Sequence, residues 1–209
     1  MPKQTDTKNL ILDTALDLFS KRGYDGVGMR DIAHNVGIRE SAIYKHFAGK
    51  QELFDTLVIR MSEEYTAHTN SLGIYHNSEM IERYKDISEN ELVKFCCGLF
   101  FYLAKDERAV KFRKILTMEQ FKNDKIGKIY RDFYFEKVLE YQGMVFKTLI
   151  DANVLIQADY KIIALQFYAP IFLLLTHYND NITDEKEIIN SLTEHVKLFI
   201  KIYSQRTKK

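Results

Sequence analysis

The stretch from Met29 to Phe47 constrains the fold more than any other part of this chain of 209 residues. Four of its apolar residues have the i, i+3, i+4, i+7 spacing of one helical face: Met29, Ile32, Ala33 and Val36. Gly37 follows, where such a helix ends and the backbone needs a left-handed residue. Ile43 and Phe47, four residues apart, then predict a second short helix. Two short helices joined by a tight turn are typical of a helix-turn-helix, whose second helix lies in the major groove of DNA.

The polar residues around the second helix have no core to enter, so we expect them to face outward. Many of them donate hydrogen bonds to phosphates and base edges, which favours a DNA-binding element over a purely structural helical corner. We predict that Arg39, Glu40 and Ser41 face base edges, although Glu40 also suits the dipole of a helix start. The other predicted DNA-binding residues are Arg30 and, as phosphate contacts, Tyr44, Lys45, His46 and Lys50.

A series of short motifs around this element occurs in a known order and spacing. They are Phe19, Gly23, Tyr24, Asp31-Ile32-Ala33, Gly37-Ile38, Ile43-Tyr44, His46-Phe47, Lys50 and Glu52-Leu53-Phe54. In these motifs the chain resembles the N-terminal domain of the TetR family of bacterial one-component transcriptional regulators. Arg39 and Glu40 stand where that family frequently has a small hydroxyl residue and a lysine, so the resemblance predicts the domain and leaves the operator sequence open.

The rest of the chain predicts helices throughout. Alternation typical of strands is absent, and Gly and Pro are sparse, so we expect an all-α fold of about nine helices. Residues 1–50 are expected to form the helix-turn-helix DNA-binding domain, and residues 51–209 a helical domain for ligand binding and dimerisation. One long helix is expected from Ile129 to about Asp151.

Charge and cysteine usage restrict the class of protein. Lys and Arg total 30 against 29 for Asp and Glu, so any affinity for DNA depends on local placement of charge. Neither a secretory signal nor a membrane span is expected, because the most apolar stretch, Ile162 to Leu175, is short and contains Gln166 and Pro170. We interpret it as a core helix. The adjacent Cys96 and Cys97 fit a reduced, cytoplasmic protein and are interpreted as buried hydrophobes rather than a redox pair.

An enzyme is not expected. The six histidines lack the spacings of metal ligands, and neither a Gly-rich phosphate loop nor a nucleophile elbow occurs. We therefore predict no catalytic residues, no metal and no cofactor.

Two requirements would explain the C-terminal part. A single recognition helix reads few base pairs, so we expect a homodimer on a palindromic double-stranded DNA operator. The last two helices are the expected dimer contact, as is usual in the TetR family, with Leu192 and Phe199 among the residues that meet the partner.

The second requirement is a ligand pocket. Fourteen Phe and thirteen Tyr either fill the core or leave a cavity between their rings, and the TetR resemblance favours a cavity for a small, largely apolar inducer. The residues predicted to line it are Phe101, Phe112, Phe121, Tyr134 and Phe167. Repression released by such an inducer is the family's commoner habit, and a regulator without a ligand is the alternative.

Overall fold

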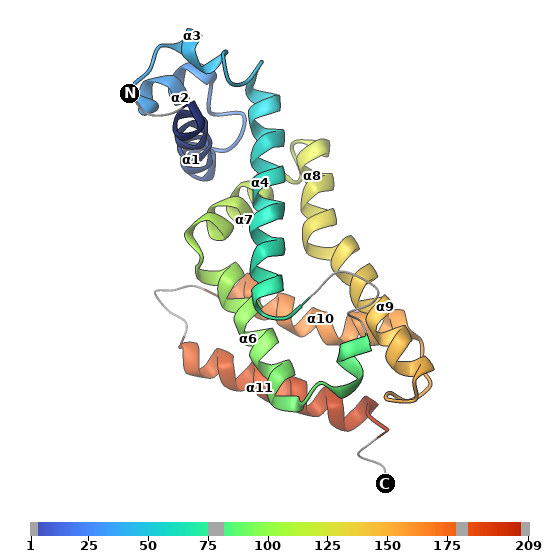
Figure 1. Cartoon of the computed structure of the whole chain (residues 1–209). Coiled ribbons are helices and arrows are strands. Elements are labelled where there is room, and N and C mark those ends of the chain that lie inside the picture. The colour runs from blue at the N-terminus through green and yellow to red at the C-terminus, as the bar shows by residue number, and fades with distance from the viewer. Residues whose placement is uncertain (1–3, 75–81, 179–183, 206–209) are drawn as a thin grey trace. The chain divides into compact units, whose positions relative to one another are not determined.

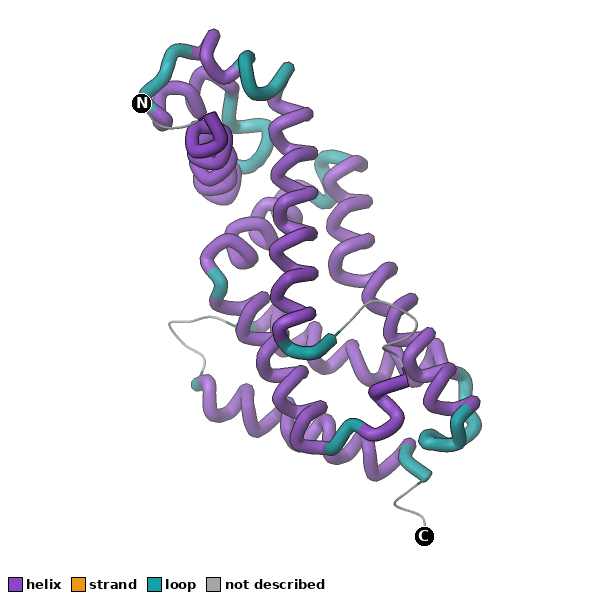
Figure 2. The backbone as a smooth tube through the Cα atoms, in the orientation of Figure 1, coloured by secondary structure: helices purple, strands orange, loops and turns teal. Residues whose placement is uncertain are grey.

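The computed structural model describes residues 4–74, 82–178 and 184–205. In these ranges the chain consists of helices, turns and loops without a strand, which confirms the all-α prediction (Figure 2). By packing, the chain divides into two compact units. Unit 1 comprises Met1–Ala67 and Glu107–Tyr130, and unit 2 comprises His68–Asp106 and Arg131–Lys209.

Unit 1 is built around helix α1. Its elements are α1 (Gln4–Arg22), α2 (Met29–Val36), α3 (Glu40–Ile43), most of α4 (Lys50–Ser71), α7 (Glu107–Glu119) and α8 (Asp124–Arg131) (Figure 1). One face of α1 is fully buried, with Ile11, Ala15 and Phe19 each at 0% exposure. Burial of this apolar face stabilises the unit, because each such side chain leaves water on folding.

Unit 2 contains the remaining helices. They are a 3-10 helix (Glu82–Asp86), α6 (Glu89–Lys105), a π-helix (Asp132–Glu136), α9 (Lys137–Asp151), α10 (Tyr160–His177) and α11 (Glu185–Tyr203). Three of the α-helices begin at the side-chain caps that their sequences suggest. Ser88 accepts from the Glu91 amide, Asp159 from the Lys161 amide, and Asp184 from the Lys186 amide.

The packing units do not follow the boundary expected at residue 50. The division into residues 1–50 and 51–209 was drawn by function and stays a prediction. By packing alone, α4 as far as Ala67 belongs with the helix-turn-helix, together with α7 and with α8 as far as Tyr130.

The long helix expected from Ile129 to Asp151 is interrupted. The π-helix at Asp132–Glu136 separates α8 from α9, and the Tyr168 hydroxyl donates a hydrogen bond of 2.8 Å to the Tyr134 carbonyl within it. A π-turn holds one extra residue, so it shifts the phase of a pattern of period 3.6 without ending the run of apolar residues that predicts a helix.

Helix α10 is a core helix on one side only. Ile163, Ala164, Phe167 and Leu175 are buried in unit 2, whereas Ile162 is 49% exposed, Leu165 48% and Leu173 68%. By length and hydropathy alone the helix also meets the criteria of a membrane span, with a mean hydropathy of 1.2, although core helices of soluble proteins meet them too. Its composition therefore reflects an exposed apolar side as well as a buried one.

Helix α11 has two apolar sides, and the expected dimer residues lie on the inner one. Leu192 is 0% exposed and Phe199 6%, because both pack into the core of unit 2. The exposed residues of this helix include Leu198 at 56% and Ile202 at 48%. A hydrophobic stripe predicts that residues are buried but not whether the covering surface belongs to the same chain.

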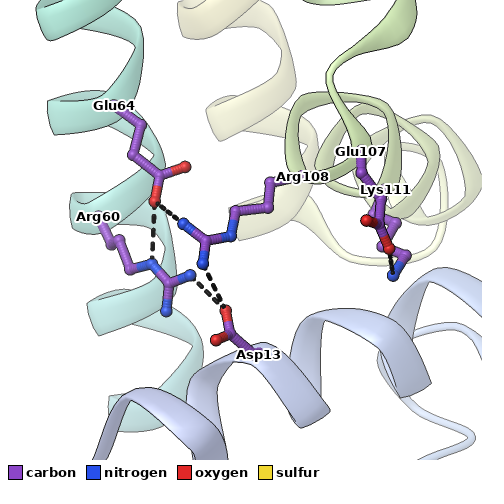
Figure 3. A network of polar contacts seen from close by, with 6 residues as sticks. All are labelled: Asp13, Arg60, Glu64, Glu107, Arg108 and Lys111. Atoms are coloured by element: carbon purple, nitrogen blue, oxygen red, sulfur yellow. Dashed lines mark hydrogen bonds and ion pairs between the residues drawn. The ribbon is translucent and has the colours of Figure 1, made fainter. Parts of the chain in front are cut away.

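Ion pairs tie α7 to α1 and α4 within unit 1 (Figure 3). The Arg108 guanidinium lies 2.8 Å from the Glu64 carboxylate and 3.4 Å from that of Asp13. Arg60, on α4, pairs with the same two acids. One turn further along α7, Lys111 lies 3.0 Å from Asp17 on α1. Several charges that share partners hold three helices together better than isolated surface pairs do.

Candidate nucleic-acid interface

The helix-turn-helix forms as its apolar spacing predicts. Ile32, Ala33 and Ile43 are at most 2% exposed, so α2 and α3 pack closely. At the start of α2 the Asp31 carboxylate accepts a 2.8 Å hydrogen bond from the Gly28 amide, and this bond lowers the pKa of Asp31, as does nearby Arg22. Gly37, with φ of 79°, ends α2 in the left-handed conformation expected for it.

Six of the eight predicted DNA-binding residues form an exposed set. They are Arg30, Arg39, Glu40, Ser41, Tyr44 and Lys45. Within the described part of the chain, Arg30, Arg39 and Lys45 have no ion-pair partner, so their charges are available to phosphates or to guanine edges. His46 is half-buried at the edge of this set.

Lys50 is placed differently from the predicted phosphate contact. Its ammonium group donates to the Tyr24 and Val27 carbonyls at 3.1 Å each, and it lies 4.3 Å from the centre of the Tyr24 ring. Two of its three donors are thus engaged inside unit 1. The geometry gives Lys50 the role of anchoring the loop between α1 and α2 to the start of α4.

The aromatic residues predicted to line a ligand cavity do not come together within either unit. Phe112 is buried in unit 1, and Phe121 is 92% exposed, so it lines no cavity. In unit 2, Phe101, Tyr134 and Phe167 lie in separate ring clusters. Tyr134 has a described ring partner on α10, Phe172, at 6.4 Å between ring centres, which the sequence did not single out. Helical spacing identifies aromatic positions but not which rings meet across helices.

The described residues favour neither a metal site nor a reactive thiol. Those residues contain no group of three or more His, Cys, Asp or Glu side chains that would hold a metal ion. Burial raises the pKa of the Cys96 thiol to about 12, and it also raises the pKa of Cys97. Both thiols therefore stay protonated near neutral pH, as expected of small hydrophobic residues.

Comparison with known proteins identifies the N-terminal region. Residues 11–57 match the sequence profile of the bacterial regulatory proteins of the tetR family. Over 51 residues the chain is 41% identical to IcaR of Staphylococcus aureus (strain Newman), the HTH-type negative transcriptional regulator of the biofilm operon icaADBC. That match covers 24% of this chain and 27% of IcaR, so the likeness to this relative is confined to about a quarter of its length.

The whole fold is also similar to solved structures. A protein from Mesorhizobium loti described as a TetR-family transcriptional regulator superposes with a TM-score of 0.71 at 20% identity, covering 98% of this chain and 100% of that one. The SmeT–triclosan complex superposes with a TM-score of 0.67 at 20% identity, covering 96% and 92%. At these identities the likeness establishes the fold alone. The sequence match is to DNA-binding regulators rather than enzymes, which agrees with the expectation from the motifs.

The placement of Lys50 predicts that its substitution lowers the stability of the protein and leaves its contacts with DNA phosphates unchanged. Lys50→Met should lower the free energy of unfolding by about 1–2 kcal/mol, because two carbonyls lose a charged donor. The salt dependence of DNA binding should be unchanged, whereas Lys45→Met should reduce its slope by about one. Urea unfolding and binding isotherms at several salt concentrations measure both effects. If Lys50→Met reduced the slope of the salt dependence as much as Lys45→Met does, Lys50 would be a phosphate contact after all.

Proposed function

We propose that this chain, whose residues 11–57 match the bacterial regulatory proteins of the tetR family, is a transcriptional repressor of the cytoplasm. It binds a palindromic operator as a homodimer and is released by a small, largely apolar inducer. The observation that carries the DNA-binding part is the exposed set on α2, on α3 and next to α3 in the sequence, in which Arg30, Arg39 and Lys45 lie without ion-pair partners among the described residues. Positively charged side chains on a packed helix-turn-helix can bind DNA, which offers negatively charged phosphates and base edges that accept hydrogen bonds.

The distribution of charge agrees with this proposal. The sequence of unit 1 holds 16 Lys and Arg against 13 Asp and Glu, whereas that of unit 2 holds 14 against 16. The balanced total therefore conceals a net basic unit that contains the helix-turn-helix. Local positive charge raises the rate and affinity of DNA binding without requiring a basic protein overall.

The exposed apolar sides of α10 and α11 support the homodimer. They carry Ile162, Leu165 and Leu173 on α10, and Ile189, Leu198 and Ile202 on α11. So many large apolar side chains on two neighbouring helices mark an interaction surface. Pairing with the same helices of a second copy would bury both sides in a four-helix bundle about a two-fold axis.

The proposed inducer is supported by SmeT, a protein of similar fold that was solved with triclosan. Unit 2 of this chain is rich in ring contacts, including those of Phe167 with Phe146 and Phe199. Helix α4 runs without interruption across the unit boundary at Ala67, so it can transmit a change in unit 2 to the helix-turn-helix. An inducer acts this way only if it binds the DNA-free state more tightly, and DNA must weaken its binding by the same factor.

Arg39 provides the direct test of base reading. Arg39→Ala should weaken binding to a protected operator duplex by roughly 1–3 kcal/mol and relax preference at one base pair of each half-site. Arg39→Lys keeps the charge but loses the planar fork, so it should retain affinity for random DNA and still lose the base preference. Equilibrium binding to the operator and to variants with single base changes measures both. Equal losses on specific and random DNA would show that Arg39 contacts phosphate only.

The dimer surface is tested on the exposed side of α10. Leu173→Glu places a charge where the partner should cover it, so the variant should sediment as a folded monomer and lose operator binding. Lys186→Glu, an exposed change on α11, should leave the dimer intact, whereas Leu192→Glu should unfold the protomer. A wild-type protein that sediments as a monomer at micromolar concentration would refute the dimer.

A further inference from the structure

The end of helix α1 is closed differently from the ends of other helices in the chain. Gly23, Gly37 and Gly73 all have φ between 75° and 80°, the left-handed conformation that ends a helix. After Gly37 the next amide, Ile38, bonds back to the Ala33 carbonyl at 3.0 Å, and after Gly73 the Ile74 amide bonds back to Thr69 at 2.9 Å. Both helices therefore close on their own backbone.

Helix α1 lacks this last backbone bond. The Gly23 amide bonds to the Phe19 carbonyl at 2.9 Å, but the following Tyr24 amide donates instead to the Glu119 carboxylate at 3.2 Å. Glu119 is 95 residues away in the sequence, at the last residue of α7. Within unit 1, α7 thus supplies the acceptor for an amide that makes no backbone bond at the end of α1.

Glu119 is an unusual residue for this position. It is 2% exposed, and its second oxygen, Oε2, is buried without a hydrogen-bond partner among the described residues. Its neighbours in the buried stripe of α7, Ile115 and Leu116, are both 0% exposed. A buried carboxylate with an unsatisfied oxygen is costly, and an apolar residue would stabilise this stripe better. The acid is therefore better explained by the contact it makes than by stability.

Glu119 and the loop after α1 are in close contact. A Cβ atom on Gly23 would lie 2.4 Å from Glu119 Oε1, so the loop and the carboxylate pack directly against each other. On its other side the loop is held by Lys50, which binds the Tyr24 carbonyl, while the Tyr24 ring lies 5.0 Å from that of Phe54. The loop continues to Gly28, where α2 begins. Polar contacts from α4 and from α7 thus both hold the loop.

We propose that Glu119 is a positioning residue for DNA binding, which sets the entry of the chain into α2 and α3 by accepting the Tyr24 amide at the end of α1. This inference rests on the proposed DNA-binding function.

The test compares variants on a duplex that the wild-type protein selects from a random library. Glu119→Leu, of similar size but without an acceptor, should weaken binding to that duplex about tenfold, the scale of losing one hydrogen bond to a charged group. Glu119→Gln keeps the acceptor and should bind within about twofold of wild type. Backbone hydrogen exchange across residues 23–28 should speed up in Glu119→Leu and not in Glu119→Gln.

Two further variants separate positioning from stability. Glu119→Asp keeps the charge but withdraws the carboxylate from the Tyr24 amide, so it should weaken DNA binding as Glu119→Leu does. It replaces Glu119→Leu in the test if that variant does not fold. Leu116→Ala destabilises the same helix through a cavity and should bind DNA normally wherever it is fully folded. The inference is wrong if Glu119→Leu or Glu119→Asp binds like wild type, or if folded Leu116→Ala loses as much affinity. A wild-type protein that selects no duplex would instead overturn the proposed function.

Discussion

A helix of four residues such as α3 cannot hold its shape alone, because the first helical turn fixes more backbone freedom than its hydrogen bonds repay. The second helix of the helix-turn-helix therefore depends on the burial of Ile43 and Phe47, which are 0% and 1% exposed. Beyond them the Glu52 carboxylate accepts from the Ala48 amide at 2.5 Å, which fixes the turn into α4. Because the buried apolar residues hold the helix in place, the residues on its outer side can be polar and exposed, among them Arg39 and Lys45.

The same constraint explains why the sequence predicted this region so well. Apolar spacing and a left-handed glycine are local signals, and Ile32, Ala33, Gly37 and Ile43 all lie where those signals place them. The exposure of Arg39 and Lys45 follows from the same pattern, since it leaves no core for them. Their contacts with DNA remain predictions.

What the sequence did not predict depends on partners far along the chain. Lys50 stands at a helix start, where a phosphate is a natural expectation, but Tyr24 and Val27 supply carbonyls from 26 and 23 residues away. The sequence analysis did not single out Glu119, although an acid one helical turn after Ile115 and Leu116, on the same apolar stripe, was a signal that could have found it. Leu192 and Phe199 were correctly expected to be buried and wrongly assigned to a partner chain, because periodicity does not identify the covering surface.

We propose that two copies of this chain read one symmetric DNA site. The purified wild-type protein can be used to select duplexes from a fully randomised library, and the selected duplexes are then sequenced. We expect enrichment of an inverted repeat whose half-site centres lie about one helical turn apart, ~34–36 Å, or a multiple of it. Enrichment of a single asymmetric site, or binding without any sequence preference, would contradict it.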